Sequence, residues 1–209
     1  MKALSLFSSA GIGEFYFKEI GIDVVIANEI VPSRAKAHQF LYPDCEMITA
    51  DITNEGVQEL IIKAAKEKKI DLIIATPPCQ GLSTAGSNKS EESLYKDPRN
   101  YLILSALNIV SEIRPDYFVI ENVPRFQKMK YTDGEDLLSL FDLLKKKYSD
   151  EYEITCNVFN AADYGIPQTR FRVVYRMWKK GLSGKMPQKE AKIVSVQDAI
   201  GDLPSLEPG

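Results

Sequence analysis

Short apolar runs alternate along this chain with stretches in which apolar residues recur every three or four positions. Runs of this length, bounded by glycine, proline or polar residues, are typical of strands buried in a parallel sheet. The longer spacing is typical of helices that cover such a sheet. The predicted strands are residues 3–7, 22–27, 46–49, 70–75, 117–120, 153–159 and 171–175.

Helical spacing follows most of these strands. Pro32 suits the first turn of a helix, and Thr132 with Glu135 matches a capping box that would begin another. Alternating strands and helices predict an α/β fold with a doubly wound, mostly parallel sheet. One helix is predicted directly after residues 11–13. Further helices are predicted at residues 32–40, 57–65, 102–113, 132–144 and 196–200.

The bulk composition fits one domain with a single core, or one domain with a short tail. The chain has 209 residues, 44% of them hydrophobic and 26% charged, and no apolar run is long enough to cross a membrane. Its apolar start is too short for the core of a signal peptide, so we expect a cytoplasmic protein.

The net charge is −3, which gives no overall basic footprint. Proteins that bind DNA usually have such a footprint, because contacts with phosphates dominate their affinity. Either this chain does not bind DNA, or its basic surface is local, or that surface lies on another part.

The cysteines and the histidine limit the possible chemistry. Cys45, Cys79 and Cys156 are far apart and odd in number, so a disulfide framework or a zinc site is not expected. His38 is the single histidine, which argues against a catalytic triad or a metal cluster built on histidine. A nucleophile would therefore need another base or a lowered pKa.

Ligands of doubly wound sheets bind at the carboxyl ends of the strands. Gly11 and Gly13 follow the first predicted strand in a turn where backbone could approach a ligand closely. Glu29 follows the second, where an acid can hold ribose hydroxyls. Tyr16 replaces the third glycine of the dinucleotide pattern, so a nucleoside without pyrophosphate fits better. An ordinary tight turn explains the glycines equally well.

Two more chemically distinctive residues follow the next strands. Asp51 would reach an adenine amino group or, as isolated aspartates more often do, cap the following helix. Cys79 comes directly after Pro77-Pro78, on a rigid platform past the end of a strand. Cysteines are often buried apolar fillers, but the polar neighbours of Cys79 do not suit that role, and the other two cysteines suit it better.

An acid and a pair of arginines complete the set. Glu121 closes the strand predicted at 117–120, where its carboxylate would point into the same cleft as Cys79; a helix cap or a surface carboxylate is the alternative. The spacing of Gln168, Arg170 and Arg172 would place all three on one face of a strand. That face could be solvated, or its charges could pair, with Glu121 as one partner.

Together these segments resemble the DNA cytosine-5 methyltransferases, over nearly the whole chain. Even residues 196–204 resemble the segment that precedes the family's target-recognition region. One departure is that Ser8-Ser9-Ala10 lies before Gly11, and another is Glu14, which stands where a further glycine is common. The matching segments are, in order, the turn at residues 7–13, Glu29, Asp51, Pro78-Cys79-Gln80, Glu121-Asn122-Val123 and Gln168-x-Arg170-x-Arg172.

The resemblance implies a fold and a division of the chain. The fold would be the Rossmann-like class I fold of methyltransferases that use S-adenosylmethionine. Residues 1–180 would form the catalytic domain that binds this cofactor, and residues 181–209 would form a tail. Residues 81–98 resemble the mobile loop that closes over the substrate base.

The resemblance also implies residue roles. Cys79 would attack C6 of a flipped cytosine, and Glu121 would hydrogen-bond or protonate N3. Arg172 would hold the cytosine O2, and Arg170 would brace the site. S-adenosylmethionine would give its methyl group to C5 and leave as S-adenosylhomocysteine, and no metal is implied. The residues implied to bind this cofactor are Phe7, Gly11, Gly13, Glu29, Ile30, Asp51, Ile52, Pro78 and Leu102.

Members of this family continue past the last matching segment, into a part that reads the DNA sequence and a final segment that completes the cofactor pocket. We therefore expect double-stranded DNA as substrate and a second polypeptide that carries this part, as in a split enzyme of a restriction–modification system. A truncated fragment and an inactive relic are the alternatives. Two other functions stay open: a non-catalytic cofactor-binding or scaffold subunit, and an RNA cytosine-5 methyltransferase.

Overall fold

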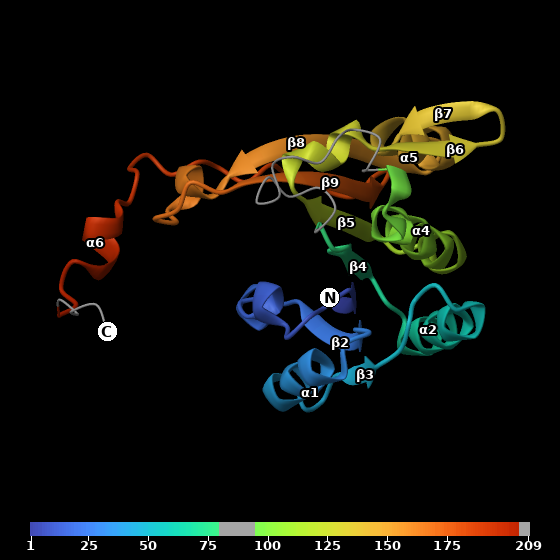
Figure 1. Cartoon of the computed structure of the whole chain (residues 1–209), viewed down its shortest axis with the longest axis horizontal. Coiled ribbons are helices and arrows are strands. Elements are labelled where there is room, and N and C mark those ends of the chain that lie inside the picture. The colour runs from blue at the N-terminus through green and yellow to red at the C-terminus, as the bar shows by residue number, and fades with distance from the viewer. Residues whose placement is uncertain (80–94, 205–209) are drawn as a thin grey trace.

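A seven-stranded sheet forms the centre of the molecule in the computed structural model, which describes residues 1–79 and 95–204 (Figure 1). The strand order is β3-β2-β1-β4-β5-β9-β8. The first five strands are parallel, whereas β9 is antiparallel to β5 and β8 to β9. This confirms the predicted doubly wound, mostly parallel α/β sheet. The strands are β1 (Lys2–Leu6), β2 (Asp23–Asn28), β3 (Glu46–Ile48), β4 (Leu72–Ala75), β5 (Tyr117–Asn122), β8 (Tyr152–Asn160) and β9 (Phe171–Lys179).

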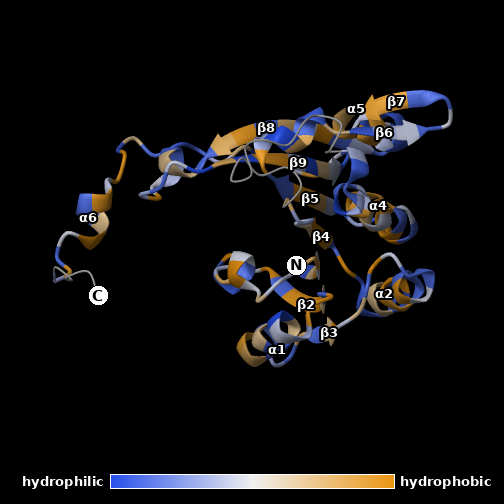
Figure 2. Cartoon of the chain, in the orientation of Figure 1, coloured by the Kyte–Doolittle hydropathy of each residue, from blue (hydrophilic) through white to orange (hydrophobic). Residues whose placement is uncertain are grey.

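Helices cover the two faces of the sheet unequally. The longer ones, α2 (Glu55–Lys68) and α4 (Leu102–Ile113), lie on one side in Figure 1. Among the described residues, α1 (Pro32–Leu41) and two single-turn 3-10 helices, η1 (Ile12–Glu14) and η2 (Lys18–Ile20), lie on the other. Figure 2 shows apolar residues concentrated on the strands and in stripes along α4. The larger core cluster therefore joins β1, β2, β4 and β5 to α2 and α4.

The helix predicted after the first glycine turn is wrong. The chain forms only η1 and η2 there. Ile12, Phe15, Tyr16 and Ile20 are each at least 60% exposed, so no continuous apolar stripe faces the sheet to stabilise a longer helix.

The helix start predicted at Thr132 is also wrong. Residues around it form a two-stranded hairpin of β6 (Lys130–Asp133) and β7 (Asp136–Ser139). Gly134, at φ 65°, makes the tight turn between them. The helix α5 (Leu140–Tyr148) begins only after Ser139, whose hydroxyl oxygen accepts a hydrogen bond from the amide of Asp142.

The described residues after β9 are mostly exposed. They contain α6 (Val196–Ile200), predicted from its spacing, which begins with a capping box between Ser195 and Asp198. The boundary at residue 180 stays a prediction. Across residues 1–79 and 95–204, no helix combines the length and apolar character needed to cross a membrane. The part of the chain that the structure describes also contains the 3-10 helices η4 (Pro98–Tyr101), η5 (Pro124–Lys128) and η6 (Ala161–Tyr164).

Candidate functional site

A cavity of about 720 Å³ lies at the carboxyl ends of β1, β2, β3 and β4. Its volume falls within the range of small-molecule sites. It is lined by eight residues predicted for the site: Phe7, Glu29, Ile30, Asp51, Ile52, Pro78, Cys79 and Leu102. Residues to which the sequence had assigned no role also line it: Ser9, Asn28, Val31, Arg34, Ala50, Thr53, Thr76, Pro98 and Arg99.

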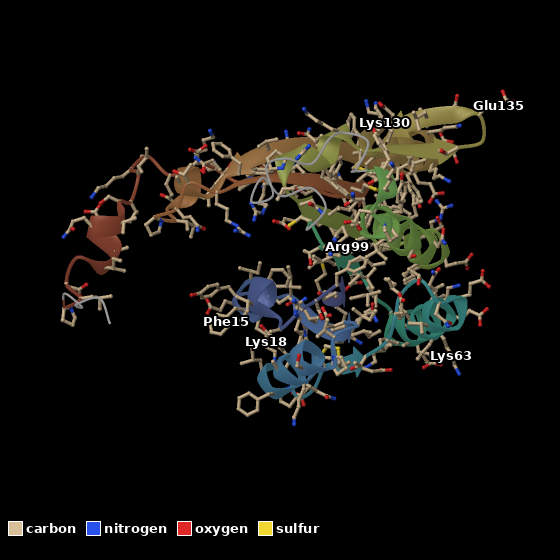
Figure 3. The ribbon with its side chains drawn as sticks, viewed as in Figure 1. Phe15, Lys18, Lys63, Arg99, Lys130 and Glu135 are labelled. Carbon is tan, nitrogen blue, oxygen red and sulfur yellow. The ribbon has the colours of Figure 1, made fainter. Side chains whose placement is uncertain are left out.

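Some of these residues carried a usable signal in the sequence and others did not. Asn28 and Thr76 stand at strand ends, where the predicted topology already places ligand-binding residues, although no role was predicted for them. Arg99 lies in η4, just before α4, and becomes part of the wall only through the docking of that helix (Figure 3). Gly11 and Gly13, both predicted to bind the cofactor, do not line the cavity.

Glu29 is the acid held most firmly in this site. It is 5% exposed. One carboxylate oxygen accepts the backbone amide of Ser9 at 2.9 Å, and the other accepts the amide of Val31 at 2.8 Å. Each oxygen keeps a second lone pair, so the carboxylate can still accept hydroxyl groups of a ligand.

Asp51 also lines the cavity and is exposed. Its Oδ1 accepts both the amide and the hydroxyl of Thr53 at 2.9 Å. The helix that follows is capped by Asn54 instead, so the alternative interpretation of Asp51 as a helix cap is wrong. Of the two isoleucines predicted beside a bound ring, Ile52 is buried and Ile30 is 57% exposed at the rim.

Cys79 stands on a backbone platform tied to the neighbouring strands. The Thr76 hydroxyl donates to the carbonyl of Phe7 at 3.2 Å, and the Asn122 side-chain amide donates to the carbonyl of Pro77 at 2.9 Å. Asn122 is 1% exposed, and its own Oδ1 accepts the amide of Val123. Cys79 itself is half-buried and lines the cavity. The predicted neighbour Gln80 and most of the loop predicted at 81–98 lie outside the described residues.

The other two cysteines are in different surroundings. Cys45 is 5% exposed in the smaller core cluster, and burial, reinforced by the negative charge of Glu14, raises its pKa to about 12. Cys156 packs half-buried against the larger cluster, and burial raises its pKa too. Neither lines the 720 Å³ cavity.

Glu121 and Arg172 form an ion pair at the same edge of the sheet. Arg172 Nε lies 2.8 Å from Glu121 Oε1, and the two side chains are 24% and 36% exposed. Because β9 is antiparallel to β5, its first residues lie beside the last residues of β5: Asn122 pairs with Val173. Neither member of the ion pair lines the cavity itself.

Arg170 lies apart from this pair. It precedes β9, is exposed, and its backbone amide donates to Asn160 Oδ1 at 3.0 Å. The strand starts only at Phe171, so the prediction that Gln168, Arg170 and Arg172 share one strand face is wrong. The structure thus groups Cys79 with the predicted cofactor residues and Glu121 with Arg172, and Asn122 connects the two groups.

Comparison with known proteins places the chain in a family. The model of the C-5 cytosine-specific DNA methylase family matches residues 1–207. The type II methyltransferase M1.HgaI of Avibacterium volantium is 41% identical over 99% of this chain and 57% of its own length. The type II methyltransferase M.AquIA of a Picosynechococcus species is 33% identical over 99% of this chain and 90% of its own length.

Solved structures agree with this assignment. A DNA modification methyltransferase encoded within an Escherichia coli prophage superimposes with a TM-score of 0.71 at 27% identity, covering 99% of this chain and 56% of that protein. The Spodoptera frugiperda DNMT2 structure shares the fold, with a TM-score of 0.65 at 21% identity over 93% of this chain. These likenesses confirm the predicted class I methyltransferase fold.

The chain belongs to the C-5 cytosine-specific DNA methylase family. It spans about half the length of most curated relatives that it matches, for example 57% of M1.HgaI and 54% of M1.HphI.

Proposed function

We propose that this chain is the catalytic part of a DNA cytosine-5 methyltransferase, which transfers a methyl group from S-adenosylmethionine to C5 of cytosine in DNA. One observation carries the proposal: a half-buried cysteine opens into the same cavity as two carboxylates suited to a nucleoside. An acid–arginine pair stands at the same sheet edge. Family membership adds the reaction class.

The cavity fits S-adenosylmethionine, which when bound supplies an electrophilic methyl group on its sulfonium. Glu29 would hold the ribose hydroxyls through the lone pairs that its two backbone contacts leave open. Asp51 would accept a hydrogen bond from the adenine amino group, with Ile30 and Ile52 flanking the adenine ring. Phe7, Pro78 and Leu102 would contact the remaining surface of the molecule. Gly11 and Gly13 would act through the shape of the turn rather than by contact.

The residues of the chain would carry the chemistry on the base. Cys79, as a thiolate, forms a bond to C6, and the displaced electron pair moves toward N3, where Glu121 hydrogen-bonds or donates a proton. C5 would then be nucleophilic and would take the methyl group, whose bond to the sulfonium breaks with both electrons left on sulfur. A base from solvent would remove the C5 proton, and the electron pair of that C–H bond would expel Cys79 as a thiolate, restore the aromatic ring and return to Glu121 any proton that it gave to N3. Arg172 would hold O2 and orient the Glu121 carboxylate, which lies 2.8 Å from its guanidinium. The exposed Arg170 would brace the site at its rim.

Covalent trapping on DNA that contains 5-fluorocytosine tests the nucleophile, because fluorine at C5 blocks the release step. For the chain coexpressed with the neighbouring reading frame, we expect Cys79→Ser to abolish both trapping and methyl transfer, and Cys156→Ser, which changes another half-buried cysteine, to leave both intact. Trapping by the Cys79→Ser protein would show that the nucleophile is assigned wrongly. Tritium transfer to tRNA instead of duplex DNA would point to an RNA substrate.

DNA recognition is proposed to need residues beyond these 209, on a second polypeptide. The support is the half-length coverage of M1.HgaI and M1.HphI together with the net charge of −3, which provides no broad basic surface for phosphates. We expect the purified chain to methylate DNA poorly and to gain activity when the neighbouring reading frame is coexpressed. Robust, sequence-specific methylation by the chain alone would refute this part of the proposal.

A further inference from the structure

The turn between β1 and η1 holds its backbone in an unfavourable conformation. Phe7 has a φ of 62° and Ser9 a φ of 51°, both in the left-handed region. For a bulky residue such as Phe7 this region is strongly disfavoured, and such conformations persist only where the surroundings enforce them. The same turn supplies Phe7 and Ser9 to the wall of the 720 Å³ cavity.

Behind this turn lies a buried polar cluster that the proposed chemistry does not use. Glu14 is 6% exposed and His38 is 0% exposed, and their side chains meet at 3.0 Å between Glu14 Oε2 and His38 Nε2. Ser5, on β1, donates its hydroxyl to the other oxygen of Glu14. A buried carboxylate is costly unless it is hydrogen-bonded on both oxygens, as this one is. The cluster joins β1, η1 and α1.

Tyr42 extends this cluster to the turn itself. Its ring packs against the His38 ring with centroids 4.7 Å apart, and its hydroxyl donates to the carbonyl of Gly11 at 2.7 Å. A Cβ on Gly11 would lie 2.4 Å from the Tyr42 ring and 2.8 Å from the His38 ring. The two rings pack directly against Gly11 and leave no room for a Cβ, which explains why only glycine fits at this position.

A hydrogen bond on the cavity side holds the other part of the turn. The amide of Ser9 donates to Glu29 Oε2 at 2.9 Å. The chain of contacts therefore runs from His38 and Tyr42 through Gly11 and the turn to Glu29, the acid proposed for the ribose hydroxyls.

We infer that Glu14, His38 and Tyr42 are positioning residues, which clamp the strained turn from behind and thereby hold Phe7, Ser9 and Glu29 in the geometry that binds the cofactor. The inference rests on the proposed function, since it assigns these residues to the same cofactor site. Glu14 is the anchor of this clamp, and it stands at a position where the family commonly has a further glycine.

The test measures the dissociation constant of S-adenosylhomocysteine by calorimetry on the full chain, together with the melting temperature without ligand. His38→Leu removes the contact to Glu14 and should weaken binding about tenfold or more, whereas His38→Gln keeps a donor and should stay within about threefold. Tyr42→Phe keeps the ring but loses the bond to Gly11, and should weaken binding about fivefold. Phe40→Ser, on the same helix and 86% exposed, is the matched control and should bind like the wild type.

The outcomes separate the two claims. Weaker binding by Tyr42→Phe and His38→Leu, with recovery in His38→Gln, supports the clamp, and Tyr42→Phe suffices if His38→Leu does not fold. If Tyr42→Phe and His38→Leu both bind S-adenosylhomocysteine with wild-type affinity, even with lower melting temperatures, the role of these residues is purely structural. That result would overturn the inference but not the proposed function. Absence of binding by the wild type, both alone and coexpressed with the neighbouring reading frame, would overturn the proposed cofactor site and the inference with it.

Discussion

Asn122 offers the sharpest test of how the site is built, because one buried side chain connects its two halves. Asn122→Asp keeps the shape of the side chain but replaces the Nδ2 donor with an oxygen. That oxygen would face the Pro77 carbonyl at the 2.9 Å now spanned by the hydrogen bond. The acceptor to the Val123 amide is retained. The backbone platform beneath Cys79 therefore loses its tie to β5.

The cost follows from burial. Asn122 is 1% exposed, so in Asn122→Asp the Pro77 carbonyl loses its partner and a carboxylate enters a buried site. We expect a loss of about 3 kcal/mol in the free energy of unfolding at pH 7.5, measured from urea midpoints. Once protonated, the introduced carboxyl could again donate to the carbonyl, so the folded state would raise the pKa of this carboxyl. Stability would then be regained as the pH falls toward the unfolded carboxyl pKa of about 4.

The functional consequence is measured separately. Alkylation of Cys79 by iodoacetamide, followed by peptide mass spectrometry, should proceed at a changed rate in Asn122→Asp, because the platform moves. Asn108→Asp, on the exposed face of α4, is the matched control and should change the free energy of unfolding by less than about 0.5 kcal/mol. An Asn122→Asp protein with wild-type urea midpoint and wild-type Cys79 reactivity would refute the reasoning.

Three further predictions follow from the site. Glu29→Gln places an amide N–H against one of two backbone amides and should weaken S-adenosylhomocysteine binding about tenfold by calorimetry; unchanged affinity would contradict the ribose assignment. Arg172→Lys should lower the methylation rate about tenfold to a hundredfold but leave cofactor affinity within about twofold, because lysine lacks the planar fork that meets Glu121. Burial raises the pKa of Cys45 to about 12, so at pH 8 its thiol should stay protonated and resist iodoacetamide while Cys79 reacts; labelling of native Cys45 as fast as Cys79 would contradict this.

The sequence predicts the sheet well because its strands are short apolar runs, and parallel order follows from alternation with helices. The two helix predictions that were wrong, at Thr132 and after residues 11–13, failed for local reasons. Thr132 and Glu135 match the capping pattern, but Gly134 between them favours a hairpin turn, and the following apolar residues serve first a strand and then α5. After β1, the apolar residues of 12–20 have helical spacing, but four of them are exposed, so no packing stabilises an α-helix.

The same distinction divides the site. The place of Cys79, Glu29 and Asp51 at one cavity could be predicted because each follows within a few residues of the end of a strand, and the carboxyl ends of parallel strands meet at one edge. Asn122 was visible only as part of a motif, and its bond to the Pro77 carbonyl joins residues 45 positions apart. His38 suggested only that no histidine chemistry was present, since its contact with Glu14 depends on how α1 packs behind the turn. Side chains that line the cavity can be predicted from strand ends, whereas side chains that hold them in place depend on tertiary contacts.

The antiparallel strand β9 has a specific consequence for the site. A parallel strand beside β5 would bring its last residues to the edge where Cys79 lies, but the antiparallel β9 brings its first residues there. Arg172, the second residue of β9, can therefore reach Glu121 near the end of β5. Reversing one strand thus lets a segment far beyond Cys79 in the sequence join the same edge, without a further crossover helix. The predicted parallel core accounts for the cavity proposed to bind the cofactor, and the antiparallel strand adds the arginine to the acid that would act on the base.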